Sequence, residues 1–291
     1  MREVAGPPGA PVVVLLHGLA ATAGLNWFTV FRPLSKHYRV IALDHRGHGR
    51  GLEPRGPFRL TDAADDVVAL ADVLGIDRFI PIGYSMGGPI AQLCWLRHRE
   101  RVEGLVLCAT SRNFRGHPRD QLMFASLPLA TLALRVPGVP AVWANGGRVL
   151  GERLAGPPFK RWAQEELRHH DRRAIVGAAG EVGRFSSRDW IGDIDVPTSV
   201  VLHTRDQLVP VRRQWKLAQA IPGAAVYVVE GDHFVVARDP KRFVPVLLDA
   251  TASVVLRARI LAKPRLRARV KMPLRKAKLP LRGAGVRSIP A

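Results

Sequence analysis

Cysteine and long apolar runs are nearly absent from this chain. Only Cys94 and Cys108 occur among 291 residues, which excludes a disulfide scaffold and predicts two buried, reduced thiols. The longest apolar candidate for a membrane span, residues 127–144, is interrupted by Arg135 and by three prolines. Because a transmembrane helix needs about 20 consecutive apolar residues, the sequence predicts no membrane crossing.

Signals for export and for cofactors are also missing. The N-terminus has one arginine followed by a stretch rich in glycine and proline, whereas a secretory signal has a basic segment before an apolar core. We therefore expect a cytoplasmic location. The chain shows no metal-ligand spacing and no phosphate-binding loop, and the glycines at 47, 49 and 51 lack the spacing of a dinucleotide site. We expect neither a metal nor an organic cofactor.

Apolar runs alternate with helical stretches along most of the chain. With 47% hydrophobic residues, a chain of this length can bury one large core. The alternation predicts an α/β fold, with a mostly parallel sheet and helices on both faces. The strand-like runs begin at Val12, Val40, Phe79, Val102, Ser199 and Val226.

Two of the expected helices have recognisable ends. Thr61 is expected to cap the first of them, and Gly75 lies just past its last periodic residue. In the second, Asp239 is a capping acid followed by Pro240 at the first helical position.

The most informative motif is the pentapeptide at residues 83–87, Gly-Tyr-Ser-Met-Gly. It lies where an apolar run gives way to a helical one, which is typical of a nucleophile elbow. There a serine on a sharp strand-to-helix turn holds its hydroxyl clear of the backbone. The flanking glycines avoid a collision with the neighbouring strand and helix. Ser85 is therefore the candidate nucleophile.

Asp206 and His233 complete a candidate triad in chain order. Each of them follows an apolar strand-like run, at residues 199–202 and 226–229. A serine is a weak nucleophile until a base takes its proton, and an imidazole suits that task near neutral pH.

Further motifs lie upstream of the serine. The run 12–16 ends in His-Gly-Leu, and residues 44–49 are Asp-His-Arg-Gly-His-Gly after another run. Together with the triad, these motifs resemble the α/β-hydrolase family over roughly residues 10–250. Family members place a strand hairpin before the strand that ends in His-Gly. Because only about ten residues precede that strand here, either the sheet lacks an edge strand or the natural start lies upstream.

The resemblance implies a role for each triad residue. His233 is the base, and Asp206 holds the Nδ1–H of its imidazole and stabilises the imidazolium. Asp232 is the alternative acid, but it would have to fold back on its own neighbour.

The mechanics of the motif also imply an oxyanion hole. Its two backbone N–H donors are expected from Met86, which follows the nucleophile, and from Leu19 in the turn after His-Gly. Several polar residues of these motifs are expected to be structural hydrogen-bonding residues: His17, Asp44, Arg46 and His48.

A substrate cleft and a lid are expected beside this site. Trp27, Phe28 and Tyr84 are candidates for the cleft wall, although Trp27 and Phe28 on an early helix are at least as often core residues. Family members place a lid where prolines and glycines interrupt the rhythm. Its first part, residues 122–134, is aliphatic and is expected to line an apolar pocket or to pack on the core. Its second part, residues 160–173, is expected to be a solvated helix.

The predicted organisation has four parts. They are the N-terminal part of the hydrolase core at 1–110, an inserted and mainly helical lid at 111–190, the C-terminal part of the core at 191–256, and a basic tail at 257–291.

A serine at the elbow favours acyl transfer. Haloalkane dehalogenases and epoxide hydrolases of this family carry an aspartate there, because their intermediate is an alkyl ester. We therefore expect a carboxylesterase-like serine hydrolase that cleaves an ester-type bond of a lipophilic small molecule. The same triad leaves thioesterase, lactonase, carbon–carbon bond hydrolase and perhydrolase activities open. A catalytically silent protein that binds through its tail is a further alternative.

Positive charge is concentrated in the tail. The net charge is +20, and the chain from Arg257 to its end has twelve Lys/Arg and no acidic residue. Four prolines break any long helix there, so we expect disorder beyond a helical extension through Leu261. Interleaved leucines and the absence of aromatic residues favour an anionic membrane surface over nucleic acid as partner. A solvated tail without a partner is the alternative.

Overall fold

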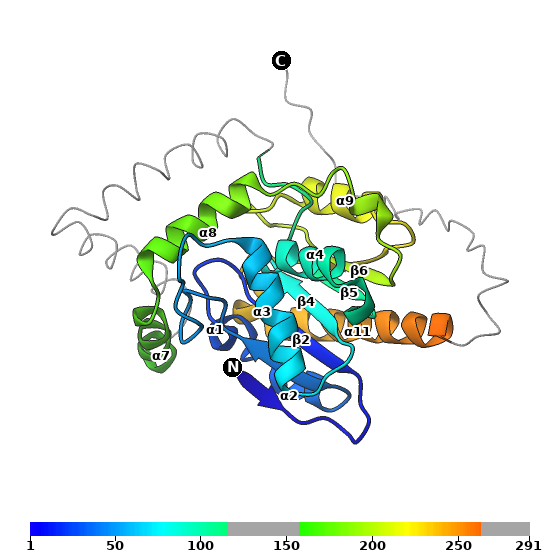
Figure 1. The fold of residues 1–291 in the computed structure, drawn as a ribbon, viewed down its shortest axis with the longest axis horizontal. Coiled ribbons are helices and arrows are strands. Elements are labelled where there is room, and N and C mark those ends of the chain that lie inside the picture. The colour runs from blue at the N-terminus through cyan, green and yellow to red at the C-terminus, as the bar shows by residue number, and fades with distance from the viewer. Residues whose placement is uncertain (116–156, 263–291) are drawn as a thin grey trace, which may run out of the picture.

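The computed structural model describes residues 1–115 and 157–262. They form one seven-stranded sheet in the order β1-β3-β2-β4-β5-β6-β7. Strand β1 pairs with β3 in antiparallel fashion, and all other neighbours are parallel. The predicted α/β class with a mostly parallel sheet is confirmed (Figure 1). The strands are β1 Arg2–Val4, β2 Val12–Leu16, β3 Arg39–Leu43, β4 Ile80–Tyr84, β5 Leu105–Cys108, β6 Thr198–His203 and β7 Ala225–Val229.

The N-terminal edge of the sheet has a strand after all. Glu3 of β1 pairs with Ile41 of β3, and the Arg39 side chain donates to the Glu3 carboxylate at 2.7 Å. The single strand β1 thus precedes β2 where the family resemblance predicted a hairpin.

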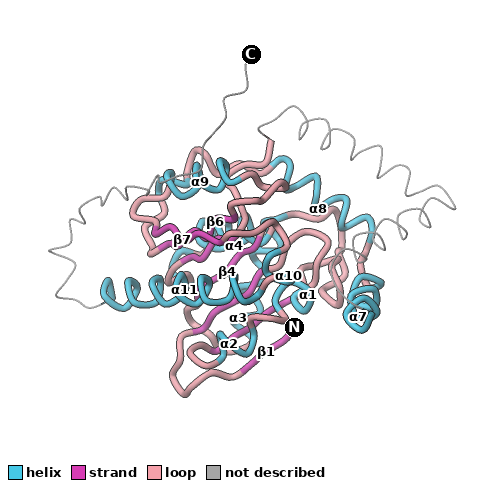
Figure 2. The backbone as a smooth tube through the Cα atoms, turned by 180° about the vertical axis from the view of Figure 1, so that it is seen from behind, coloured by secondary structure: helices cyan, strands magenta, loops and turns pink. Residues whose placement is uncertain are grey.

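Helices cover both faces of the sheet, as predicted. One buried cluster joins the sheet to α3, α4, α8 and α9, and the other joins it to α1, α2, α10 and α11. Figures 1 and 2 show these two groups from opposite sides. The helices are α1 Ala23–Trp27, α2 Phe31–Ser35, α3 Leu60–Val73, α4 Gly87–Arg97, α7 Pro157–Arg168, α8 Arg172–Arg184, α9 Val211–Ala220, α10 Val235–Arg238 and α11 Pro240–Ala262, with short 3₁₀ helices at Arg99–Arg101 and Ile191–Asp193.

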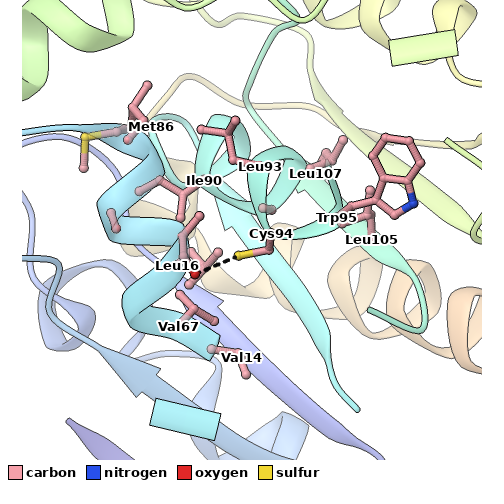
Figure 3. Packing of buried hydrophobic residues seen from close by; sticks show 14 of the residues in the cluster. Val14, Leu16, Val67, Met86, Ile90, Leu93, Cys94, Trp95, Leu105 and Leu107 are labelled. Atoms are coloured by element: carbon pink, nitrogen blue, oxygen red, sulfur yellow. Dashed lines mark hydrogen bonds between the residues drawn. The ribbon is translucent and has the colours of Figure 1, made fainter. Parts of the chain in front are cut away.

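The core around α4 accounts for one of the two cysteines. Figure 3 shows Cys94 among Ile90, Leu93 and Trp95, and its thiol donates a weak hydrogen bond to Ala64 O at 3.7 Å. Both cysteines are buried and free, and burial raises the pKa of each thiol. The predicted pair of buried, reduced thiols is confirmed.

Helix ends agree with the sequence in two of three predicted places. Gly75 follows α3 with φ +62°, and Pro240 is the first residue of α11. The prediction of Thr61 as a cap is wrong, because α3 already begins at Leu60 and its N-cap, Arg59, makes no side-chain capping bond. Leu60 is only 3% exposed, so burial of its side chain favours a helix that begins at Leu60 and therefore includes Thr61.

The predicted lid lies partly outside the described residues, including its aliphatic stretch 122–134. Its second part is visible as α7 and α8, which follow β5 and precede β6 in the chain. The prediction of a solvated helix holds for Arg161 and Arg168, which are exposed, but Ala163 and Glu166 are buried. Helix α7 therefore packs against the core through one side.

Helix α11 crosses the predicted tail boundary at residue 257 and is described as far as Ala262. Among the described residues, no helix is both long and apolar enough to span a membrane.

Candidate active site

Ser85 lies on the turn between β4 and α4, and its backbone is left-handed, with φ +52°. Glycines on either side make this turn possible. A Cβ on Gly83 would lie 2.3 Å from the carbonyl oxygen of Gly87, and one on Gly87 would lie 2.1 Å from that of Leu16. The strand and the helix can approach this closely only because no side chain intervenes.

The backbone of Ser85 is held by its neighbours. Its N–H donates to Cys108 O at 3.0 Å, and its carbonyl accepts from Gly88 N at 2.9 Å and from Thr110 Oγ1 at 2.8 Å. Such left-handed positions cost of order 1–3 kcal/mol each and cluster at functional sites. In residues 1–115 and 157–262, the non-glycine residues with positive φ all follow the carboxyl ends of parallel strands, and they are Ala20, Ser85 and Ala109.

His233 and Asp206 meet at the same end of the sheet. The loops after β6 and β7 carry them, and His233 Nδ1 donates to Asp206 Oδ2 at 2.7 Å. Both residues are buried, with exposed fractions of 9% and 6%. Because Nδ1 carries the proton of this bond, Nε2 of neutral His233 is left with its lone pair, as a general base requires.

The Asp206 carboxylate accepts hydrogen bonds from its own loop as well. Oδ1 accepts from Leu208 N at 2.9 Å and from Val209 N at 2.8 Å. The alternative acid, Asp232, is occupied elsewhere, since it accepts from Phe234 N at 2.8 Å and from Arg238 at 2.6 Å. The structure thus places Asp206, and not Asp232, on His233.

Gln214 on α9 is a site residue that the sequence did not reveal. Its Nε2 donates to Asp206 Oδ2 at 3.2 Å and to Val209 O at 2.6 Å, and its Oε1 accepts from His203 N at 3.0 Å. The side chain is fully buried. A signal was present, because Gln214 lies three residues before Leu217 on the apolar side of an amphipathic helix.

The candidate cleft residues divide between core and surface. Tyr84 is buried, and its hydroxyl donates to His233 O at 2.7 Å. Trp27 is also buried and meets the Tyr84 ring edge-on at 5.7 Å between ring centroids. Phe28 is 38% exposed and lies 5.6 Å from the ring of Trp162 on α7. Tyr84 and Trp27 therefore lie beneath the triad residues, and Phe28 alone of the three reaches solvent.

The two predicted oxyanion donors come from adjacent turns. A Cβ on Gly18 would lie 3.4 Å from Ser85 Cβ, so the turn after β2 lies beside the elbow. Gly18 N already donates to Asn26 Oδ1 at 3.0 Å, which leaves the next N–H, that of Leu19, as the candidate. Met86 lies at the start of α4, where helical N–H groups lack partners within the helix. Its side chain is buried in the same apolar cluster as Ile90 (Figure 3).

The structure agrees with structural roles for the polar motif residues. His17 Nε2 accepts from His45 N at 2.9 Å, so its Nδ1 carries the proton and donates to Gly18 O at 2.8 Å. Asp44 accepts from Ala23 N at 2.7 Å and from Arg50 N at 3.1 Å. Likewise, Arg46 pairs with Asp66 at 2.6 Å, and His48 Nδ1 donates to Arg46 O at 3.2 Å.

The segment that contains α7 is bonded to the turn that bears Leu19. Glu166 accepts from Thr22 Oγ1 at 2.7 Å and pairs with Arg2 at 3.0 Å. A second link forms between the α7–α8 connection and residues 47–49, where Gly49 N donates to His170 Nδ1 at 2.7 Å.

Three neutral histidines lie packed beneath these turns. The ring centroids of His17 and His45 are 4.2 Å apart, and those of His17 and His48 are 5.2 Å apart. Burial lowers the pKa of all three, to about 3 for His45. Among the described residues, no group bonds to either ring nitrogen of His45.

The comparisons with known proteins agree with this fold. A family model described as alpha/beta hydrolase fold matches residues 11–144. The enol-lactonase structure from Burkholderia xenovorans LB400 is 27% identical with a TM-score of 0.72, and it covers 86% of this chain and 95% of that chain.

Two proteins similar in sequence extend the comparison. The poly(3-hydroxyalkanoate) depolymerase of Ectopseudomonas oleovorans is 25% identical over 257 residues, which are 84% of this chain and 85% of that protein. An uncharacterized protein of Mycobacterium tuberculosis is 27% identical over 258 residues, which are 81% of this chain and 74% of that protein. These similarities, together with the sheet topology, show an α/β-hydrolase fold, and they support hydrolase activity.

Gly87→Ala should destabilise the protein strongly. The added Cβ would meet the backbone of Leu16 at 2.1 Å, and overpacking of this kind costs typically about 1–3 kcal/mol or more. Gly56→Ala is the matched control, because nothing lies within 4 Å of its added Cβ. Thermal unfolding of both variants tests this, and equal melting temperatures would contradict the close approach.

The buried histidines should make the protein acid-sensitive. Above about pH 6.5 they are neutral in both the folded and the unfolded state. Below that pH the unfolded chain binds protons that the folded chain excludes, so the free energy of unfolding falls by about 1.4 kcal/mol per pH unit for each histidine. For His45 this loss continues until the pH approaches its folded pKa of about 3.

Urea unfolding at pH 7 and pH 5.5 measures this loss. We expect His45→Leu to lose about 1 kcal/mol less than the wild type between these pH values. His37→Leu is the control, because His37 is exposed. Identical losses in the wild type and in His45→Leu would show that His45 is not a buried neutral group.

Proposed function

We propose that this protein is a serine hydrolase that cleaves an ester-type bond, with Ser85 as nucleophile, His233 as base and Asp206 as the orienting acid. The observation that carries the proposal is the 2.7 Å bond from His233 Nδ1 to the buried Asp206 carboxylate, at the end of the sheet that bears the Ser85 elbow. This bond fixes the tautomer that a general base needs.

Catalysis proceeds in two acyl-transfer steps. Ser85 Oγ attacks the ester carbonyl carbon while its proton passes to His233 Nε2, and the N–H groups of Met86 and Leu19 stabilise the oxyanion. The protonated imidazole then donates to the leaving alcohol as the ester C–O bond breaks. Water next attacks the acyl-enzyme and gives its proton to His233, and the carboxylic acid leaves as Ser85 regains its proton.

Two similarities support an ester or lactone of a lipophilic compound as substrate. One relative is named as an enol-lactonase and another as a poly(3-hydroxyalkanoate) depolymerase, and a lactone and such a polyester both contain ester bonds. Phe28 and Trp162 offer apolar aromatic surface near the Leu19 turn. A chain-length panel of acyl esters, lactones and thioesters tests this preference.

Ser85→Ala should abolish both ester turnover and covalent labelling by a fluorophosphonate probe, while the melting temperature stays near that of the wild type. Asp206→Asn should lower kcat by roughly 10⁴, the loss that the corresponding change causes in a serine protease, because the wrong tautomer is held. Asp232→Asn is the matched control and should retain most activity. The triad assignment fails if Asp232→Asn loses turnover and Asp206→Asn keeps it.

Gln214→Leu should lower kcat by roughly tenfold to a hundredfold with little change in KM, because an unmade bond to a buried charged group costs about 1–3 kcal/mol. The neighbouring Gln207→Leu is the control, since Gln207 is exposed. Steady-state kinetics on a soluble ester measures both. An unchanged kcat in Gln214→Leu would remove Gln214 from the support of Asp206.

A further inference from the structure

A hollow of about 620 Å³ lies at the opposite end of the sheet from Ser85. Its walls come from α11 between Leu248 and Arg259 and from the segments before β2 and β3, including Pro11 and Tyr38. Because the β strands after these segments run toward the elbow, the hollow is separate from the candidate active site.

The rim of the hollow is cationic. Lys36 and Arg259 both line it and both are exposed. Arg259 also lies near enough to Tyr38 to oppose the rise in its pKa that burial causes. Within residues 1–115 and 157–262, neither cation forms an ion pair with a carboxylate. Asp249 is the one acidic residue among the lining residues of the hollow.

Apolar side chains lie exposed beside these cations. Leu256 is 60% exposed and Ile260 is 37% exposed. Residues three or four apart lie on the same side of a helix, so Ile260 and Arg259 both lie beside Leu256 on one side of α11, with Leu256 between them. The opposite side of these turns is fixed, because Val254 is fully buried.

Arg257 has a different task from Arg259. Its guanidinium donates to Thr198 O at 2.8 Å, to Ser199 Oγ at 3.1 Å and to Gly223 O at 3.0 Å. These bonds tie α11 to the start of β6 and to the turn before β7. They hold the helix end in place while its outer side stays exposed, beyond the sheet (Figures 1 and 2).

The sequence continues from this surface into its most basic stretch. Residues 263–291 come directly after Ala262 and contain ten Lys/Arg and no acidic residue. Each cation near a membrane of anionic lipid contributes on the order of 1 kcal/mol, and apolar side chains add to binding by inserting among the headgroups.

We propose that the outer side of the α11 end, together with the rim of the hollow, docks onto a bilayer of anionic phospholipid. The docking surface consists of Lys36, Leu256, Arg259 and Ile260, and in the sequence it is followed by ten Lys/Arg among residues 263–291. Charge complementarity and exposed aliphatic side chains together fit a lipid headgroup layer. Nucleic acid fits less well, because residues 257–291 contain no aromatic side chain on which a base could stack.

Vesicle sedimentation of the full-length protein tests the proposal. The wild type should pellet with vesicles of phosphatidylcholine and phosphatidylglycerol but not with pure phosphatidylcholine, and added salt should weaken the binding. Lys36→Glu/Arg259→Glu should bind the anionic vesicles at least about tenfold more weakly, since each lost cation is worth about fivefold. Leu256→Ser/Ile260→Ser should also bind more weakly.

Matched controls lie on the opposite face of the sheet. Lys216→Glu on α9 and Val73→Ser on α3 change exposed residues of the same kinds and should pellet like the wild type. The docking surface is refuted if its two double variants pellet as well as these controls, or if the wild type binds no anionic vesicle. Tighter binding to duplex or single-stranded DNA than to vesicles, with a steep salt dependence, would assign the surface to nucleic acid.

The same samples separate docking from hydrolysis. Both double variants should keep fluorophosphonate labelling and turnover of a soluble ester, because the docking surface lies away from Ser85. Conversely, Ser85→Ala should lose labelling and still pellet with anionic vesicles.

Discussion

The buried carboxylate of Asp206 is the constraint on which the arrangement of the site depends. A charge removed from water is tolerated only where donors surround it, and Asp206 accepts from two backbone N–H groups of its own loop, from Gln214 and from His233. These donors come from the loop after β6, from α9 and from the loop after β7. Supplying hydrogen-bond donors to this one carboxylate therefore sets the positions of three elements relative to one another. The same bonds orient the His233 imidazole.

A second buried carboxylate organises the other side of the site. Glu166 of α7 joins Arg2 of β1 to Thr22, which caps α1 just after the Leu19 turn. Arg2 also reaches Asp44 at 3.5 Å. Because the Glu166 carboxylate is buried, losing either Arg2 or Thr22 would leave it short of a hydrogen-bond donor, so the N-terminal strand, the Leu19 turn and α7 depend on one another. The antiparallel strand β1 thereby supports the site from a distance, through the position of Arg2.

Local sequence pattern was enough to propose the triad, whereas the contacts around its residues join parts of the chain that are far apart in sequence. The sequence was enough to find the three candidates, Ser85, Asp206 and His233, because each comes after an apolar strand run. Parallel strands bring their carboxyl ends together. The roles of Gln214 and Glu166 could not be predicted in this way. Glu166, for example, bonds to Arg2 across 164 positions of sequence, and no local pattern indicates that pairing. Tyr84 illustrates a third case: the motif placed it beside the nucleophile, but only the fold shows that its ring turns inward to hold the His233 carbonyl. The prediction of Thr61 as a helix cap was wrong because burial of Leu60 outweighed the capping preference of Thr61.

The direction of α11 explains how one domain can carry two separate surfaces. Helix α11 comes after β7 and α10 and packs on β5, β6 and β7. It returns along the parallel strands toward their amino ends, where it lines the hollow together with Pro11 and Tyr38. In open α/β sheets, ligands bind beyond the carboxyl ends of the strands. In this chain the loops that leave those ends carry Ser85, Asp206 and His233. A helix that returns along the sheet must then end near the amino ends of the strands. The cations and aliphatic residues of the proposed docking surface lie at that end. A bilayer bound there would leave the triad loops facing water, so substrate would reach Ser85 from solution and not from the bound lipid layer.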